Sequence, residues 1–328
     1  MPLETVSVIG GGAWGTALAQ AAAMAGRSVT LVVRNSDHSA AINQSHVNAA
    51  ALPGQVLLSQ VVASAEFTGA DIVVLAVPAQ ATRTLLASID PALLAGRPVV
   101  LSAKGLEAGT LARQSEILAD MAPHAIPYVL SGPSFAADVA AGRPTAITLA
   151  GDDADQTSAL ATALAGPSFR PYAADDRIGV EIAGALKNVY ALACGAVEGA
   201  QLGASARAAL IARGYAEMAR MVTAMGGSAH TLTGLAGLGD LTLTCTSVQS
   251  RNYQFGMALG AGRAAAEILG SGAKLAEGVT TAPVAAALAR SLHVDAPLID
   301  AVDAVVAGTA DIATIVAGLM SRPLKREH

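Results

Sequence analysis

Residues 6–26 read VSVIGGGAWGTALAQAAAMAG, an apolar run followed by glycines and then by a helix-forming segment. The three spaced glycines serve different purposes, because Gly10 allows a tight turn, Gly12 lets the backbone approach a pyrophosphate, and Gly15 lets the helix pack on the strand. A second strand at Ser28–Val33 completes a βαβ unit. The amides at the N-terminus of the helix would then hold phosphates. The stretch therefore predicts binding of NAD or NADP.

The residue that follows the second strand bears on the choice between these cofactors. An acid usually stands there and binds the ribose 2′-hydroxyl of NAD, whereas this chain has Arg34. An arginine can hold a 2′-phosphate or stack on adenine, and an exposed arginine at a strand end can also have no such role. The sequence therefore admits NADP as well as NAD.

Composition limits the classes of protein to consider. The 328 residues predict two domains, at about 150 residues per domain. The chain is 53% hydrophobic and 14% charged with a net charge of -5, so no nucleic-acid surface is indicated. Two cysteines without a CxxC pair, and histidines without ligand spacing, predict no disulfide framework and no metal site. Because no signal peptide or uninterrupted apolar span is found, we expect a cytoplasmic protein.

The first half of the chain alternates short β-branched runs with helical stretches. Strands are expected at Val6–Ile9, Val29–Val33, Ile72–Val77, Val99–Ser102, Tyr128–Leu130, Ala146–Leu149 and Phe169–Tyr172. Helices are expected at Gly15–Ala25, Ala79–Ile89, Leu111–Met121, Phe135–Ala141 and Ala154–Leu164. Strands that alternate with helices indicate parallel βαβ units, so the predicted fold is an α/β Rossmann-type doubly wound sheet.

The second half changes to helices without a convincing strand. They are expected at Ile178–Val197, Ala206–Met225, Tyr253–Leu259, Val284–Ser291, Leu298–Val306 and Ile312–Leu319, with glycine-rich breaks between them. We therefore predict a dinucleotide-binding Rossmann domain over residues 1–178. An all-helical substrate and catalytic domain is predicted over residues 179–328.

One lysine interrupts an apolar helical stretch of the second half. Lys187 is the only charged residue between Ile182 and Val197. Burial lowers the pKa of a lysine, so Lys187 is a candidate to exchange a proton near neutral pH. A snorkelling lysine or a structural ion pair is the alternative. In the first half, ligands gather at the carboxyl ends of parallel strands, which places residues 102–105 and 131–134 beside the cofactor.

Two further groups of polar residues follow Lys187. Asp240 lies in a glycine-rich turn, where it can bind a substrate hydroxyl or hold Lys187, or act as an ordinary turn or capping residue. Ser250, Arg251 and Asn252 combine a cation with two hydrogen-bonding side chains at the start of an expected helix. A phosphate there would meet amides and a guanidinium group together. A simple helix cap would explain Ser250 alone.

Four segments closely resemble one known family. They read AKGLE at 103–107, SGPSFA at 131–136, GALKNVYA at 184–191 and GLGDLTLTCTSVQSRN at 237–252. With the glycine motif, they resemble the NAD(P)-dependent glycerol-3-phosphate dehydrogenases almost collinearly over the whole chain. The resemblance implies an oxidoreductase that interconverts dihydroxyacetone phosphate and sn-glycerol 3-phosphate with NADP or NAD. It also implies a supply to glycerophospholipid synthesis, and a homodimer.

The resemblance implies roles for single residues as well. Lys187 would be the proton acceptor, and Lys104 and Asp240 would complete the catalytic set; which lysine does more of the proton transfer stays open, and Asn188 has no firm role. The three residues of the catalytic set would also contact the substrate, together with Gly132, Ser134, Ser250, Arg251 and Asn252. The cofactor would be bound by Gly10, Gly12, Ala13, Trp14, Gly15, Arg34, Lys104, Ala136, Arg251, Leu275 and Glu277.

Two other classes of protein compete with this interpretation. The first is another two-domain dehydrogenase with a helical second domain that acts on a hydroxy acid or a sugar acid. A carboxylate substrate would need a clamp placed differently from residues 250–252. The second is a non-catalytic NADP sensor, which has no reason to keep Lys104, Lys187 and Asp240 together.

Overall fold

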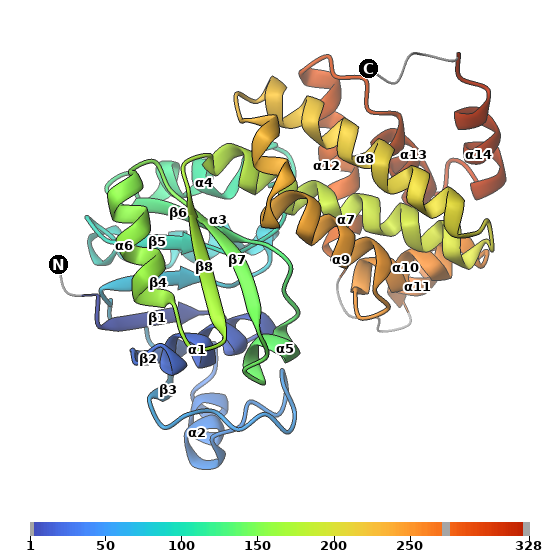
Figure 1. The fold of residues 1–328 in the computed structure, drawn as a ribbon. Coiled ribbons are helices and arrows are strands. Elements are labelled where there is room, and N and C mark those ends of the chain that lie inside the picture. The colour runs from blue at the N-terminus through green and yellow to red at the C-terminus, as the bar shows by residue number, and fades with distance from the viewer. Residues whose placement is uncertain (1–2, 271–275, 324–328) are drawn as a thin grey trace.

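A computed structural model describes residues 3–270 and 276–323. In these residues an α/β part is followed by a helical part (Figure 1). The predicted fold class, a Rossmann-type sheet followed by an all-helical region, is confirmed. The change from strand to helix falls between Ala174 and Arg177. The domain boundary at residue 178 stays a prediction.

In the described part of the chain, eight strands form one sheet in the order β3-β2-β1-β4-β5-β6-β7-β8. The order reverses beside β1, so the glycine loop that follows β1 leaves the sheet at the point where dinucleotides bind in such folds. Apolar residues cover both faces of the sheet: α1 and α6 pack on one face, and α3 and α4 on the other (Figure 1). The strands are β1 (Thr5–Ile9), β2 (Ser28–Val32), β3 (Val61–Ser64), β4 (Ile72–Leu75), β5 (Pro98–Leu101), β6 (Ile126–Ser131), β7 (Thr145–Ala150) and β8 (Phe169–Ala174). The helices are α1 (Ala13–Met24), α2 (Ser36–Ser45), α3 (Thr82–Ala87), α4 (Gln114–Met121), α5 (Ala136–Ala140) and α6 (Ala154–Leu164).

The expectation of parallel pairing throughout is wrong at one position. β7 pairs antiparallel with β6, and β8 then pairs parallel with β7. A parallel β7 would require the chain to return along the sheet by roughly 20 Å, the length of a six-residue strand. The intervening helix α5 has only 5 residues, so it rises by about 7 Å. Residues 132–144 join β6 to β7 without the long crossover helix that usually connects parallel strands, and the chain enters β7 antiparallel to β6.

Among the α-helices and strands of the described residues, four were not expected from the sequence: α2, β3 and, in the helical part, α9 (Asp240–Thr246) and α11 (Ala265–Gly270). All of them are short, and α2 is polar on most of its surface, so hydrophobic periodicity is weak in each. The helix expected from Val284 begins earlier, as α12 (Glu277–Ser291), and contains Pro283. Pro283 is the seventh residue of this helix, beyond the first turn, where a proline usually ends a helix, which explains why the sequence predicted a start only after it.

The helical part is built around one long central helix. This helix, α7 (Arg177–Gly199), contributes buried residues along almost its whole length to a core shared with α8 (Ala204–Ala224), α10 (Arg251–Gly260), α12 and α13 (Pro297–Val306). The last helix described is α14 (Ile312–Met320). Only α7 among the described helices is long and apolar enough to cross a membrane, and 94% of its apolar window is buried inside the protein. It therefore has the character of a core helix.

Glycines bring α10 into direct backbone contact with α7. A Cβ atom at Gly195 or Gly199 of α7 would lie 2.0 or 2.1 Å from a carbonyl oxygen of α10. A Cβ atom at Gly256 or Gly260 of α10 would lie 2.1 Å from a carbonyl oxygen of α7. Such distances are far below van der Waals contact, so only glycine fits at these four positions. Helix α10 is thereby held against the C-terminal half of α7.

Candidate functional site

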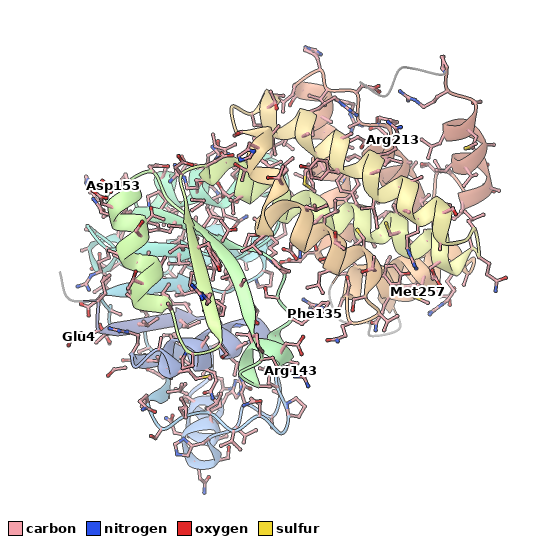
Figure 2. The ribbon with its side chains drawn as sticks, in the orientation of Figure 1. Glu4, Phe135, Arg143, Asp153, Arg213 and Met257 are labelled. Atoms are coloured by element: carbon pink, nitrogen blue, oxygen red, sulfur yellow. The ribbon has the colours of Figure 1, made fainter. Side chains whose placement is uncertain are left out.

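A cleft of about 620 Å³ lies between the sheet and the helical part. From the α/β part it is lined by the glycine loop and by the carboxyl ends of strands, and Phe135, on its wall, lies on the side facing the helices (Figure 2). Eleven of the predicted site residues line it: Gly12, Ala13, Trp14, Lys104, Ser134, Ala136, Lys187, Ser250, Arg251, Asn252 and Glu277. The cleft thus collects residues that are distant in the sequence.

The remaining predicted residues lie outside the lining of the cleft. Gly10 and Gly15 shape the loop from behind, Asp240 is completely buried beneath the lining, and Arg34 is exposed after β2. Gly132 lies below Ser134 at the end of β6. The predicted cofactor contact Leu275 falls outside the described residues.

The glycine loop has the geometry that a pyrophosphate site requires. Gly10 has a φ of +126°, and a Cβ atom there would lie 2.4 Å from the carbonyl oxygen of Ala76. A Cβ atom at Gly15 would lie 1.9 Å from the carbonyl oxygen of Gly10. At Gly12 the space is open, and no side chain caps α1 among the described residues. The first amides of α1 are therefore free to receive an anion, so the residues fit a dinucleotide.

The segment after β2 leaves both cofactors possible. Asn35 caps α2, and its side-chain oxygen accepts from the amides of Asp37 and His38 at 2.7 and 3.3 Å. These amides are therefore occupied, and the carboxylate of Asp37 in the first turn disfavours a further anion. The guanidinium of Arg34 remains as the group that can receive a 2′-phosphate.

Asp240 joins the two candidate lysines at the floor of the cleft. Lys187 Nζ donates to Asp240 Oδ1 and, at 2.9 Å, to Thr244 Oγ1. Lys104 Nζ donates to Asp240 Oδ2 at 2.7 Å and to the carbonyl oxygen of Gly132 at 3.1 Å. The side chain of Asp240 is 1% exposed and that of Lys187 is 7% exposed. One carboxylate thus fixes both ammonium groups, one from each part of the chain.

These contacts set the charges of the site. Burial lowers the pKa of Lys187 to about 8, and the positive charge of Lys104 acts in the same direction, against the attraction of Asp240. Burial alone would raise the pKa of Asp240, but the two lysines outweigh it and hold that pKa below its usual range. Asp240 therefore stays ionised, while Lys187 can change its protonation state near neutral pH.

Local structure explains why Asp240 faces the lysines. The residues before it form a single turn of π-helix, Leu235–Gly239, and a Cβ atom at Gly237 would lie 2.2 Å from the carbonyl oxygen of Leu232. This wide turn packs closely on the chain before it and delivers Asp240 to the first position of α9. Of the roles considered for Asp240, holding Lys187 is the one that its contacts display.

A chain of carboxamides runs beside the lysines. Asn188 Nδ2 donates to the carbonyl oxygen of Lys104 at 3.0 Å, and its Oδ1 accepts from Asn252 Nδ2 at 2.9 Å. Asn252 Oδ1 in turn accepts from the amide of Gly278 at 2.8 Å. Asn252, predicted to bind substrate, therefore also connects α10 with α7 and α12. One hydrogen of its amide group remains for a ligand in the cleft.

The start of α10 forms the cationic end of the cleft. Ser250 is its N-cap, and Ser250 Oγ accepts from the amide of Tyr253 at 3.2 Å. Arg251, the next residue, is exposed and lines the cleft. Burial raises the pKa of the nearby Glu277 carboxyl, and the charge of Arg251 partly offsets this effect. A guanidinium group and the first amides of a ten-residue helix thus face the same space.

Two family descriptions match the chain. Residues 5–157 match the NAD-dependent glycerol-3-phosphate dehydrogenase N-terminus, and residues 176–317 match the C-terminus of the same enzymes. The chain belongs to the NAD-dependent glycerol-3-phosphate dehydrogenase family. This confirms the resemblance seen in the four sequence segments.

Relatives in this glycerol-3-phosphate dehydrogenase family match over their full length. A glycerol-3-phosphate dehydrogenase, NAD(P)+, from Caulobacter vibrioides is 48% identical, with 100% of both chains covered. One from Methylobacterium radiotolerans is 50% identical, with 100% of this chain and 99% of the relative covered. The crystal structure of glycerol-3-phosphate dehydrogenase from Coxiella burnetii has a TM-score of 0.92 at 37% identity, covering 98% of this chain and 100% of that one.

Several residues of this dehydrogenase site were not predicted. The cleft is also lined by Asn188, Thr244, Gln249 and Gln254, and by Ala51 and Leu52. Thr244 could have been found, because it lies one turn after Asp240 in a helix. Ala51 and Leu52 have apolar side chains that neither titrate nor form hydrogen bonds, and no motif in their local sequence indicates a role in the site.

Proposed function

We propose that this chain interconverts dihydroxyacetone phosphate and sn-glycerol 3-phosphate with NADPH or NADH. The observation that carries the proposal is the pair of lysines held on Asp240 in the same cleft as Arg251. The lysines on Asp240 are suited to proton exchange at a carbonyl or hydroxyl oxygen, and Arg251 is suited to binding a phosphate. The full-length relatives named as glycerol-3-phosphate dehydrogenases support the same reaction.

The α/β part would hold the cofactor, which supplies or accepts the hydride when bound. The open space at Gly12 and the uncapped start of α1 would receive its pyrophosphate. Ala13, Trp14, Ala136 and Glu277 line the same cleft and would contact the rest of the molecule. Arg34 would meet the adenosine end, which is why either NADP or NAD is expected.

Lys187 would carry the proton of the reaction. With a pKa of about 8, its ammonium form can give a proton to the C2 oxygen during reduction, and its amine form can take one back during oxidation. Lys104 would place its charge near the same oxygen and polarise the carbonyl group. Asp240 would hold both Nζ atoms and remain ionised throughout, because both of its oxygens already accept from ammonium groups.

Arg251 and the start of α10 would bind the substrate phosphate. Charge-assisted hydrogen bonds from a guanidinium group are stronger than neutral ones and match the geometry of a phosphate. Ser134 and Asn252, on the same cleft, would bind the remaining oxygens of the substrate. Ser250 already caps α10 with its side chain and would act by keeping the helix start in place.

The preference of the enzyme for a phosphorylated over an unphosphorylated ketone tests this function. Oxidation of the reduced nicotinamide is followed by absorbance with dihydroxyacetone phosphate and, separately, with unphosphorylated dihydroxyacetone. We expect turnover of the phosphorylated ketone and a strong preference for it. In Arg251→Ala, the KM for dihydroxyacetone phosphate should rise by about 10- to 100-fold, because a hydrogen-bonded charge is lost.

A surface variant serves as the control for Arg251. Arg290→Ala removes an exposed ion pair with Asp300 at the other end of α12 and should leave the KM unchanged. Turnover of a ketone that carries a carboxylate, without turnover of dihydroxyacetone phosphate, would sink the proposed reaction. An unchanged KM in Arg251→Ala would remove Arg251 from the phosphate site.

We also infer the setting of the reaction from the family resemblance. The product would enter the synthesis of glycerol-based phospholipids, and the protein would work in the cytoplasm as a homodimer. The buried position of α7 supports the absence of a membrane-spanning role for that helix.

A further inference from the structure

The loop that carries Lys104 has no regular secondary structure. It follows β5 and runs from Ser102 to Arg113 without a strand or helix. Its backbone carbonyls therefore lack the partners that a ladder or a helix would provide. A loop of this kind positions a functional side chain only if other groups fix its backbone.

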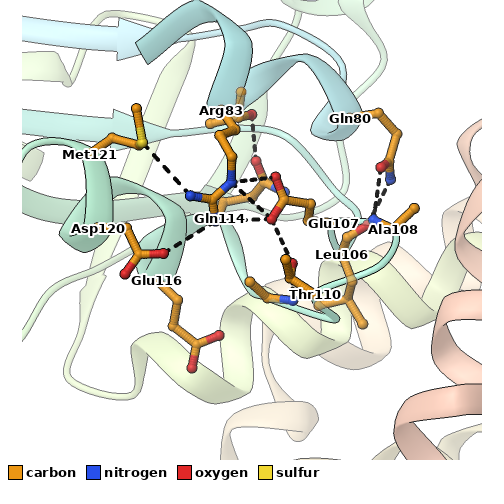
Figure 3. Close-up of polar contacts among 12 residues, drawn as sticks. Gln80, Arg83, Leu106, Glu107, Ala108, Thr110, Gln114, Glu116, Asp120 and Met121 are labelled. Carbon is orange, nitrogen blue, oxygen red and sulfur yellow. Dashed lines mark hydrogen bonds and ion pairs between the residues drawn. The ribbon is translucent and has the colours of Figure 1, made fainter. Parts of the chain in front are cut away.

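Side-chain carboxamides supply the missing partners at three consecutive carbonyls. The carbonyl oxygen of Lys104 accepts from Asn188 Nδ2 at 3.0 Å. That of Gly105 accepts from Gln114 Nε2 at 3.0 Å, and that of Leu106 accepts from Gln80 Nε2 at 2.7 Å. Gln80 also accepts from the amide of Ala108 at 2.9 Å, and these contacts around Gln80 appear in Figure 3. The loop is thus tied from three directions.

Gln114 is the most enclosed of these tethers. It is 2% exposed at the start of α4, and its Oε1 accepts from Thr82 Oγ1. Both ends of the carboxamide are therefore used. A Cβ atom at Gly105 would lie 2.9 Å from Ala79 Cβ, which shows how closely the tethered loop packs on the chain behind it.

An ion pair anchors the middle of the loop. Arg83 Nε and Nη2 donate to Glu107 at 2.8 and 3.0 Å, and Nη2 also reaches Asp120 at 3.2 Å (Figure 3). Thr110 Oγ1 donates to the same carboxylate of Glu107. The carboxylate of Glu107 is therefore held by Arg83 of α3, which also binds Asp120 of α4.

We propose that Gln114 and Gln80 are positioning residues of the dehydrogenase reaction, acting through Lys104. The proposal rests on the function proposed above. Lys104 must reach both Asp240 and the substrate oxygen from an irregular loop, and the two glutamines fix the backbone directly after it. A carboxamide suits this place because it donates to a carbonyl without adding a charge near the two lysines. Displacement of a catalytic group by about 1 Å costs up to 100-fold in rate.

Methionine substitutions test the proposal, because methionine has nearly the volume of glutamine and no donor. In Gln114→Met we expect kcat with dihydroxyacetone phosphate to fall by about 10- to 100-fold, with little change in the KM for the cofactor. Gln80→Met should act in the same direction and more weakly. Because Gln80 is exposed, this variant keeps the test valid if Gln114→Met folds poorly.

A double-mutant cycle separates positioning from general damage. In a Lys104→Met background, either glutamine substitution should lower kcat by less than about twofold, because the group that it positions is gone. Gln20→Met is the matched control: Gln20 is 5% exposed, and its Oε1 accepts from the amide of Leu58 in a different loop. It should lower stability and leave kcat near that of the wild type.

The outcomes distinguish this inference from the proposed function. Equal losses of kcat with and without Lys104, or no loss in Gln114→Met and Gln80→Met, would overturn the positioning role. A wild-type protein that does not turn over dihydroxyacetone phosphate would instead overturn the proposed function.

Discussion

Replacement of Lys187 by methionine is expected to lower kcat by about 1,000-fold, the usual contribution of a general acid or base. Lys187 has the lowered pKa needed for proton exchange, and Lys104, held at the other oxygen of Asp240, is not placed to take over its position. The fold should persist, because Asp240 keeps its contact with Lys104. Steady-state rates with dihydroxyacetone phosphate measure the loss, and circular dichroism confirms folding.

The rates of reduction and oxidation should depend on pH in opposite directions. Reduction needs the protonated form of Lys187, so its rate should fall as the pH rises through about 8, and oxidation should show the opposite trend. Lys187→Arg keeps a cation beside Asp240 but cannot release a proton in this range, so it should be folded and slow. A Lys187→Met enzyme with nearly wild-type kcat and the same pH profile would exclude Lys187 as the proton carrier.

Gly256→Val should destabilise the protein by about 3 kcal/mol, the upper range for an overpacked core. A Cβ atom there would lie 2.1 Å from the carbonyl oxygen of Leu192, a backbone atom that cannot turn aside. The helices must separate, and with them the start of α10 moves away from Lys187 and Asn188. The substrate KM should therefore rise together with the loss of stability. Denaturant unfolding and steady-state kinetics measure the two effects.

Gly318 provides the control for this substitution. It lies within α14, and a Cβ atom there would have open space around it. Gly318→Ala should raise stability by up to about 1 kcal/mol, since alanine is the better helix former. If Gly256→Val were as stable as the wild type, the close contact of α7 and α10 would not be a requirement of the fold.

The sequence predicts those parts of the site that depend on local patterns. The glycine loop is defined by the motif glycines Gly10, Gly12 and Gly15 and by the strand before them, so the whole pattern lies within residues 6–15. Lys187 is recognisable as a lone charge in an apolar helix. The family resemblance added Lys104 to the catalytic set and favoured the functional interpretation of Asp240 and Arg251. The meeting of these residues depends on the folding of two separate parts of the chain.

The remaining features depend on contacts between distant segments. The bond from Asn188 to Lys104 joins residues that are 84 positions apart, and no local pattern reveals it. The sharing of one carboxylate by Lys104 and Lys187 was not predicted, because it depends on how α9 packs against both parts. The antiparallel direction of β7 accompanies a connection whose helix, α5, has only 5 residues, and the periodicity of a strand does not predict its direction in the sheet. The carboxamide tethers behind Lys104 are further examples.

Transfer of deuteride from the cofactor to C2 of dihydroxyacetone phosphate is the direct test of the proposed reaction. The protein is incubated with dihydroxyacetone phosphate and NADPH or NADH deuterated at the transferring position of nicotinamide C4, and the product is analysed by mass spectrometry and NMR. We expect sn-glycerol 3-phosphate with one deuterium, bound to C2, and with the phosphate retained. Cofactor oxidation without labelled glycerol 3-phosphate, or carbon-bound deuterium that comes only from heavy water, would contradict it.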